Sequence, residues 1–446
     1  MPSDLLLRRL AAPALLLMLG ACEPPTPPDP LPEPETLTPA EWLQANAHPI
    51  RSLSIADRDF SDLQPLKAAI GDARVVMLGE QTHGDGTTFL AKARLVAFLH
   101  QEMGFDVLAW ESGMWDLAQA WRHVQAGEDV HEAARRSIYA LWMRSEEVLP
   151  TFDYVTSTLG TARPLEMAGV DNQFSGTLAR DSMHVLTEQF ARRIGSAVPD
   201  DPEWPAAKET LHELASSLHY ETKPTAAEQA RLLRLLAALA ADAGARPPTD
   251  REARFWRQVL AGVDAHARAT WASPPNQSNV EASEARDAQM GRNVVWLANV
   301  HYPGRKIIVW AASAHIARGV AELTRLNGGQ PYRYTWNMRM GAQAHTVLGD
   351  DMYTIGFTAG TGTHAPYHLT PTTLEAPLAE SMEAYFSQAG LQNAFVDFRA
   401  PSAHGEWLRD VQARPFGYIY YRGNWAQVFD GMIYTHVMTP STHASR

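Results

Sequence analysis

The stretch VVMLGEQTH, residues 75–83, decides how the chain folds. Its four apolar residues predict a buried strand, and Gly79 with the polar run behind it predicts a turn at the strand's carboxyl end. A helical pattern follows over residues 89–103, and a second apolar run, FDVLAW, covers residues 105–110. Strand, helix and strand within about forty residues predict a βαβ unit, whose strands are parallel.

The same pattern recurs later in the chain. LEMAGV at residues 165–170 leads into Asp171, and KIIVWA at residues 306–311 leads toward His315. Further strand candidates lie at residues 353–357, 394–398 and 417–421. Apolar runs of this length, bounded by polar turns, are typical of strands buried in a parallel sheet.

Residues 172–303 differ in composition from the segments on either side. Ala, Leu, Arg and Glu dominate there, which predicts helices. We therefore expect an α/β fold with a mostly parallel sheet flanked by helices, formed by residues 38–171 and 304–446. The helical segment at 172–303 is then an inserted cap subdomain over the catalytic cleft.

The N-terminus predicts export and lipidation. Residues 1–21 form a signal peptide pattern, with two arginines before an apolar run that is too short to span a bilayer. Cys22, the only cysteine, follows Leu-Gly-Ala in a pattern that resembles the lipobox of bacterial lipoproteins, and a proline-rich tether occupies residues 22–37. The alternative is a cleaved signal peptide with an incidental cysteine. We expect a lipid-anchored protein of the cell envelope, on the periplasmic face or the cell surface.

Composition limits the class of partner. The chain has 446 residues, 45% of them hydrophobic, and a formal net charge of -12. A chain of this length and apolar content can bury a large core, as expected of a globular enzyme. The acidic balance argues against nucleic acid and against anionic lipid surfaces as partners. We expect a monomer that acts on a small molecule and meets a membrane only through the lipid anchor.

Ionisable residues follow the carboxyl ends of four predicted strands: Glu80 and His83, Glu111, Asp171, and His315. Ligands of open α/β sheets bind at this edge, so adjacent strands would bring these side chains into one cleft. Each residue also has a simpler interpretation. Glu80 could cap the next helix, and Asp171 could begin an Asx-turn.

Signatures of other hydrolases are missing from the sequence. There is no Gly-x-Ser-x-Gly nucleophile elbow. The His-Glu pairs at residues 131–132 and 212–213 lack the second histidine of a zinc-protease helix. Water activated by a histidine is therefore the simplest nucleophile.

Several motifs together resemble the erythromycin esterase family. They are LGEQTHG at 78–84, KARLV at 92–96, Glu111, Trp142 with the acidic run behind it, GVD at 169–171, RDAQM at 286–290 and WAASAH at 310–315. The resemblance spans roughly residues 40–440. Each motif is short, but their order and spacing make the set specific.

The resemblance implies an ester hydrolase that needs no metal or other cofactor, best known for opening macrolide lactones. His83 would be the general base, with Glu80 or Glu111 orienting it. His315 would stabilise the oxyanion or protonate the leaving alkoxide, and Lys92 would place positive charge near the carbonyl.

The resemblance further assigns four residues to substrate binding, namely Arg94, Trp142, Asp171 and Arg286. Arg94 lies two residues beyond Lys92, so it points elsewhere on a helix, where it could instead brace an acid.

Departures from the family pattern at Gln81, Asp85-Gly86 and Ser313-Ala314 weaken the case for a macrolide substrate. Two other functions remain open. One is a metal-dependent hydrolase that uses the same two histidines and carboxylates around zinc or manganese. The other is a haem- or ligand-binding envelope lipoprotein without turnover.

Overall fold

The apolar run at residues 75–78 forms β2 (Val75–Leu78), and all four of its side chains are buried. The structure, a computed structural model, describes residues 37–216, 223–273, 279–327, 330–333, 339–365, 370–400 and 405–443. The predictions for the signal peptide, for Cys22 and for nearly all of the tether concern residues outside this part of the chain. Within it, no helix combines the length and the apolar composition that crossing a bilayer requires.

The main sheet is mostly parallel, which confirms the predicted fold class. Its strands are β1 (His48–Pro49), β2, β3 (Phe105–Gly113), β4 (Glu166–Asp171), β5 (Lys306–Trp310), β8 (Met352–His364), β9 (Thr372–Thr373), β10 (Asn393–Asp397) and β13 (Gly431–Met438). They lie in the order β1-β10-β13-β8-β2-β5-β3-β4, and β9 pairs with β8. Pairing is parallel from β13 through β4 and antiparallel for β1, β10 and β9.

The predicted βαβ unit consists of β2, α3 (Gly86–Met103) and β3. Gly104 ends α3 in the left-handed conformation, with φ of 77°, which glycine adopts without strain. The two strands of the unit are not neighbours, because β5 pairs with both of them and lies between. A strand that follows the helical segment in the sequence thus completes the centre of the sheet.

A second, smaller sheet is antiparallel. It contains β6 (Thr324–Asn327), β7 (Gln330–Arg333), β11 (Val411–Phe416) and β12 (Ile419–Gly423) in the order β11-β12-β6-β7. The strand expected at residues 417–421 begins only at Ile419. Gly417 and Tyr418 instead form the hairpin turn, with φ of 61° and 59°. The Gly417 N–H donates to the carbonyl of Gln81 at 2.9 Å, so this turn contacts the loop behind β2.

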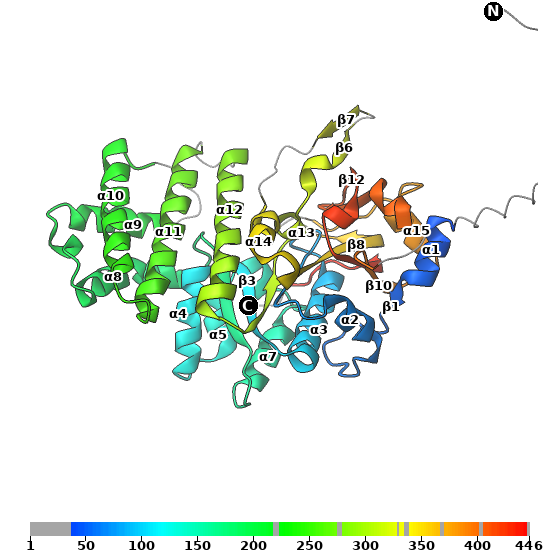
Figure 1. The fold of residues 1–446 in the computed structure, drawn as a ribbon, viewed down its shortest axis with the longest axis horizontal. Coiled ribbons are helices and arrows are strands. Elements are labelled where there is room, and N and C mark those ends of the chain that lie inside the picture. The colour runs from blue at the N-terminus through cyan, green and yellow to red at the C-terminus, as the bar shows by residue number, and fades with distance from the viewer. Residues whose placement is uncertain are drawn as a thin grey trace, which may run out of the picture. The chain divides into compact units, whose positions relative to one another are not determined.

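Helices cover the sheet and fill the long connection between β4 and β5. The remaining helices are α1 (Pro39–Asn46), α2 (Gln64–Ile70), α4 (Met114–Gln125), α5 (Val130–Arg135), α6 (Ala140–Met143), α7 (Leu149–Thr158), α8 (Thr177–Arg193), α9 (Trp204–Ser216), α10 (Ala226–Gly244), α11 (Arg251–Ala272), α12 (Val280–Trp296), α13 (Ser313–Ile316), α14 (Met340–Leu348) and α15 (Met382–Gln388). Figure 1 shows α10, α11 and α12 side by side, with α12 nearest the strands. A π-helical turn, η3 (Leu297–His301), continues α12 toward β5.

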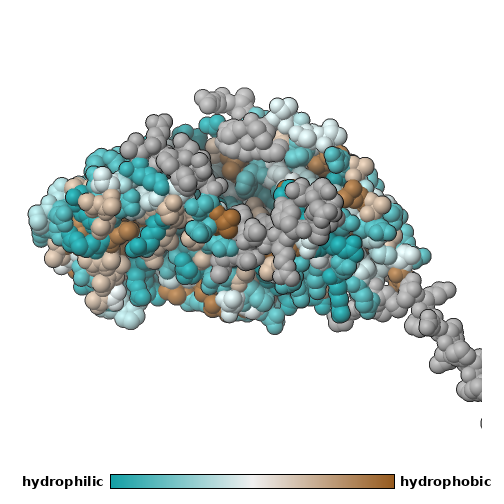
Figure 2. Space-filling model, turned by 90° about the horizontal axis from the view of Figure 1, so that it is seen from above, coloured by the Kyte–Doolittle hydropathy of each residue, from teal (hydrophilic) through white to brown (hydrophobic). Residues whose placement is uncertain are grey.

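The surface between these helices is largely polar. Figure 2 shows one face, on which hydrophobic side chains are scattered among hydrophilic ones. The exposed large apolar residues belong to separate elements, among them Leu159, Val280 and Val347. Scattered apolar residues of this kind are normal for a globular protein and mark no binding face by themselves.

A β-bulge shapes the end of β3. Trp110 pairs with Gly169 and Gly113 with Asp171, so β3 carries one more residue than β4 over this interval. The extra residue falls at Glu111 and Ser112, and bulges beside active sites often redirect a side chain in this way. Gly169 is required here, because a Cβ atom at this position would lie 2.5 Å from the carbonyl oxygens of both Ser112 and Gly113.

We predict that Gly169→Ala destabilises the protein by about 3 kcal/mol, because the added methyl group must displace the backbone of the bulge. Gly160→Ala is the matched control, since a Cβ there would meet no atom within 4 Å. Urea unfolding followed by circular dichroism measures both variants. Equal unfolding midpoints for the two would show that the bulge tolerates a side chain.

Candidate active site

Four neighbouring strands bring the predicted ionisable residues to one edge of the sheet. β2, β5, β3 and β4 are adjacent in this order and pair in parallel, so their carboxyl ends lie together. Glu80, Glu111 and Asp171 are buried there, each exposing no more than 3% of its surface. Such an edge is where open α/β sheets hold ligands.

Glu80 is the centre of the first half of the site. Its Oε1 accepts hydrogen bonds from His83 Nδ1 and from the indole N–H of Trp142, each at 2.9 Å. Its Oε2 accepts from Lys92 Nζ at 2.6 Å. Lys92 is completely buried and also donates to the carbonyl of Ala311 at 3.2 Å. Glu80 therefore does not cap α3, which was the simpler interpretation of this residue.

His83 is held by two neighbours and remains accessible. The rings of His83 and Trp142 pack edge to face, with a centroid distance of 5.4 Å. The His83 side chain is 34% exposed, whereas that of Glu80 is fully buried. Because Nδ1 faces the Glu80 carboxylate, it carries the proton in the neutral ring, and Nε2 keeps its lone pair. The ring is thus oriented as a base.

The ionisable groups in this half of the site shift one another's pKa values. Burial opposes the charge of Glu80, but the charge of Lys92 and the hydrogen bond from His83 outweigh it and hold the Glu80 pKa below its usual value. Burial also lowers the pKa of Lys92, to about 8, against the opposing effect of Glu80. For His83, burial is outweighed by the hydrogen bond to Glu80 and the charge of Glu111, so its pKa is raised.

His315 is the centre of the second half. It lies in α13, just behind β5, and its Nδ1 is 2.6 Å from Asp287 Oδ1. Its Nε2 is 3.2 Å from Glu111 Oε1. Burial opposes the charge of the ring, but Asp287 and then Glu111 outweigh it and raise the pKa of His315 to about 9. His315 is therefore an imidazolium at neutral pH.

Arg286 joins the two acids at the ends of β3 and β4. Its Nη2 donates to Glu111 at 3.0 Å and to Asp171 at 2.5 Å, and its Nε donates to both carboxylate oxygens of Asp171 at 3.1 Å. Its Nη1 lies 3.4 Å from His315 Nε2. Burial opposes the charge of Glu111, but His315 and Arg286 hold its pKa well below the usual value.

The two acids expected beside His83 take different positions. Glu80 makes the contact with His83, whereas Glu111 bonds Arg286 and the backbone N–H of Ala312, the latter at 2.9 Å. Asp171 does form the expected Asx-turn, accepting from Gln173 N–H at 3.0 Å, and it also pairs with Arg286. The turn and the ion pair therefore coexist at Asp171.

Arg94 lies outside this cluster, so its assignment to substrate binding is not supported by its position. Its guanidinium donates to both oxygens of Asp62 at 2.8 Å and to the carbonyls of Ser52 and Asp59. The reason is helical geometry, because residues two apart in α3 point in nearly opposite directions. Arg94 braces the loop before α2, which was the second interpretation of this residue.

Asp287 and Tyr139 belong to the cluster but were not assigned a role from the sequence. Asp287 is fully buried and pairs with His315, and the Tyr139 hydroxyl donates to Asp171 at 3.4 Å. Asp287 adjoins Arg286 in the RDAQM motif, and that position was its only signal in the sequence. Tyr139 had none, because it precedes the short α6 in a connection without a clear pattern.

The acidic and histidine side chains of the cluster are not arranged as a metal site. Within the described ranges, no group of three or more His, Cys, Asp or Glu side chains could hold a metal ion. The carboxylates of the cluster pair instead with Lys92 and Arg286. The cluster is a network of alternating cations and anions, most of them buried.

Two relatives match nearly the whole chain. YbfO of Bacillus subtilis (strain 168), whose name assigns it provisionally to the hydrolases, is 25% identical over 427 residues, covering 90% of this chain and 91% of its own. Erythromycin esterase type II of Escherichia coli is 25% identical over 438 residues, covering 88% of this chain and 96% of its own.

Solved structures share the fold. A Bacillus cereus protein superposes with a TM-score of 0.73 at 19% identity, covering 91% of this chain and 98% of its own. A succinoglycan biosynthesis protein superposes with a TM-score of 0.67 at 21% identity, covering 91% of this chain and 98% of its own. A mutant of the erythromycin esterase EreC, in its open conformation, superposes with a TM-score of 0.66 at 18% identity, covering 87% of this chain and 97% of its own.

The family description for erythromycin esterase matches residues 100–438, which is most of the chain. The matched segment contains Glu111, Asp171, Arg286 and His315, and it begins after the loop that carries His83. The names of the relatives agree with a hydrolytic activity. The chain belongs to the erythromycin esterase family, and its membership identifies it as a hydrolase.

Proposed function

We propose that this protein hydrolyses a carboxylic ester or lactone with a water molecule that His83 activates, without a metal ion. The observation that carries the proposal is the pair of Glu80 and His83, with its 2.9 Å hydrogen bond at an accessible imidazole. A buried carboxylate on Nδ1 fixes the tautomer and stabilises the imidazolium that forms when Nε2 takes a proton.

The reaction begins with attack of the water oxygen on the carbonyl carbon, while one proton of the water passes to His83 Nε2. The carbonyl oxygen becomes an oxyanion in the tetrahedral intermediate. The intermediate then collapses, the bond to the alcohol oxygen breaks, and a protonated histidine supplies the proton that the leaving alkoxide needs. The products are an alcohol and a carboxylic acid, and the acid releases its remaining proton to solvent to become a carboxylate; the proton that His83 took from water balances the one donated to the alkoxide.

His315 and Arg286 are the groups suited to the developing negative charge. His315 stays cationic because Asp287 and Glu111 flank it. The Arg286 guanidinium places a second positive charge 3.4 Å from His315 Nε2. Cations fixed in a buried site stabilise a transition state without having to reorganise. In this reaction His83 acts in its neutral form as the base and His315 acts in its protonated form, so the two histidines have opposite roles.

The pairing of the carboxylates supports a reaction without a metal. Glu80 is paired with Lys92, and Glu111 and Asp171 are paired with Arg286. A divalent cation would have to displace these buried cations, which would then lose their partners. The names of the relatives support an ester as the substrate class, and the substrate itself is not assigned.

We predict that His83→Ala lowers ester turnover by at least ~100-fold, because the general base is lost. Purified protein is assayed on simple aryl esters and on macrolides. His123→Ala is the control, since this histidine is 43% exposed and pairs with Glu128 in another part of the molecule.

Chelation is tested in the same assay. Turnover that survives an excess of chelator agrees with the proposal. Stoichiometric metal in the purified protein, together with loss of turnover on chelation, would instead assign the site to a metal-dependent hydrolase.

We predict a bell-shaped dependence of kcat/KM on pH. His83 acts in its neutral form, so activity falls as the pH drops through a pKa that is raised above 6.5. The cationic groups act in their protonated forms, so activity falls again as the pH rises through the pKa values of Lys92, about 8, and His315, about 9. A profile that keeps rising above pH 9 would contradict a role for protonated His315.

We predict that Asp287→Asn lowers the pKa of His315 from about 9, because the amide no longer attracts the imidazolium. Titration of the His315 ring by NMR measures the change, and the alkaline limb of the activity profile should shift in the same direction. Glu281→Gln, an exposed position in the first turn of the same helix, is the control. An unchanged His315 titration in Asp287→Asn would refute the pairing.

A further inference from the structure

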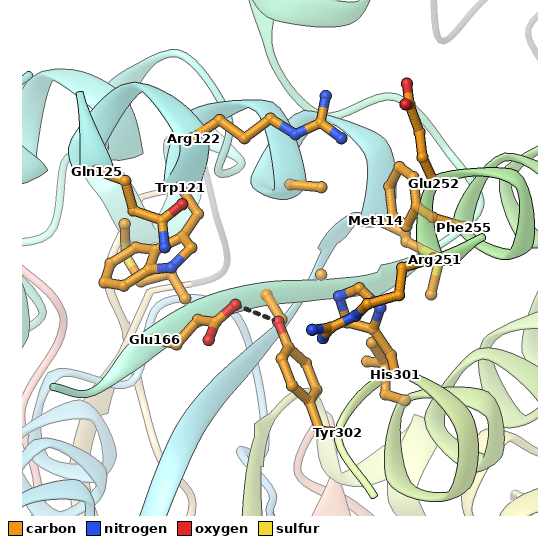
Figure 3. A pocket seen from close by; sticks show the side chains of 15 residues that line it. Met114, Trp121, Arg122, Gln125, Glu166, Arg251, Glu252, Phe255, His301 and Tyr302 are labelled. Atoms are coloured by element: carbon orange, nitrogen blue, oxygen red, sulfur yellow. Dashed lines mark hydrogen bonds between the residues drawn. The ribbon is translucent and has the colours of Figure 1, made fainter. Parts of the chain in front are cut away.

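A second cavity lies against β4, the edge strand of the main sheet. It has a volume of about 360 Å³, and α4, β4, α11 and η3 supply its walls. Figure 3 shows strand β4 running across it, with side chains reaching in from the helices on either side. Pockets for small molecules begin at about this size. The residues of the catalytic cluster are not among those that line it.

Two guanidinium groups in the cavity wall have no ionic partner. Arg122 of α4 and Arg251 at the start of α11 both line the cavity (Figure 3). Neither forms an ion pair with any residue in the described part of the chain. Arg254, one turn further along α11, has a buried Nε that lacks a hydrogen-bond partner among the described residues. Two arginines of the cavity wall, Arg122 and Arg251, thus have donors free for a ligand, whereas Arg254 does not line the cavity.

The carboxylates in the wall already have other partners. Glu166 accepts from the Tyr302 hydroxyl at 2.6 Å and from Arg305 at 2.7 Å. Glu252 pairs with Arg193 at 3.0 Å. Both acids are therefore engaged by groups other than Arg122 and Arg251, whose guanidinium groups remain without an ionic partner in the described part of the chain.

His301 of the cavity wall lies close to the same arginines. Burial, followed by the charges of Arg251, Arg254, Arg305 and Arg122, lowers its pKa to about 4. The ring is therefore neutral at physiological pH, and it stacks on Trp296 at a centroid distance of 4.9 Å. It belongs to the π-helical turn η3, a distortion that occurs often at functional sites.

Aromatic rings form the rest of the wall. Phe255, His301 and Tyr302 line the cavity, and the rings of Phe255 and Tyr302 lie 5.9 Å and 4.5 Å from that of His301. Flat apolar rings beside unpaired guanidinium groups suit a ligand with an apolar body and a negative end. A small monoanion of this kind can fill the volume.

We propose that this cavity is a binding site for a small organic anion, separate from the hydrolytic site. The anionic group, a carboxylate, phosphate or sulfonate, lies between Arg122 and Arg251. The aromatic or apolar body of the ligand packs against Phe255 and His301.

The test is a fluorescence titration of the full chain with anilinonaphthalene sulfonate, a planar aromatic anion. The variants are Arg122→Gln, Arg251→Gln and the double variant. Each substitution removes one charge-assisted contact, so Kd should rise ~5-fold in each single variant and further in the double variant. Arg257→Gln is the matched control, because Arg257 is exposed on the same helix and lies beside Gly244 of α10.

Three comparisons separate this site from general apolar binding. N-phenylnaphthylamine, a neutral analogue of the probe, should bind all variants equally. Phenyl phosphate should displace the sulfonate probe, and inorganic phosphate at the same concentration should not. Equal affinity of the sulfonate probe for the wild type and the double variant would overturn the proposal, and equal displacement by inorganic phosphate would overturn the role of the aromatic wall.

Discussion

The arrangement of the ionisable cluster depends on the pairing of Arg286 with Glu111 and Asp171. Two carboxylates at adjacent strand ends, both buried, would repel each other if no cation lay between them. The guanidinium supplies that cation, and against the opposing effect of burial it acts together with His315 to hold the pKa of Glu111 well below its usual value. The same principle applies at Glu80, where Lys92 supplies the buried cation. The site is therefore a set of mutually dependent charges rather than separate catalytic groups.

The positions of the first acids and histidines could be predicted from the sequence, because each follows an apolar run. Val75–Leu78 precedes Glu80, and Lys306–Trp310 precedes His315. Parallel strands bring such residues to one edge. The order of the strands could not be predicted in the same way. β5 follows the helical segment yet lies between β2 and β3, and only the packing of the whole sheet determines that placement.

The rest of the cluster comes from positions without a strong local signal. Asp287 is placed by the rotation of α12, and a buried aspartate in a helical pattern resembles any other polar residue until its partner is known. Arg94, by contrast, was assigned to the site from the sequence but lies elsewhere, because its closeness to Lys92 in the sequence implied a shared site. In α3 the two side chains point about 200° apart, so one reaches Glu80 and the other Asp62. Trp142 was expected to touch substrate, but its indole N–H supports Glu80.

Helix α12 brings Arg286 and Asp287 to the cleft as adjacent residues of opposite charge. The helical segment between β4 and β5 therefore contributes a dipole to the buried site and no net charge. Each of these charges loses water on docking, and each is compensated by an opposite charge on the sheet side, Arg286 by Glu111 and Asp171, and Asp287 by His315. Removal of either side chain of α12 would consequently leave a buried charge on the sheet side without its partner, so the docking of this segment and the charge state of the site depend on the same two residues.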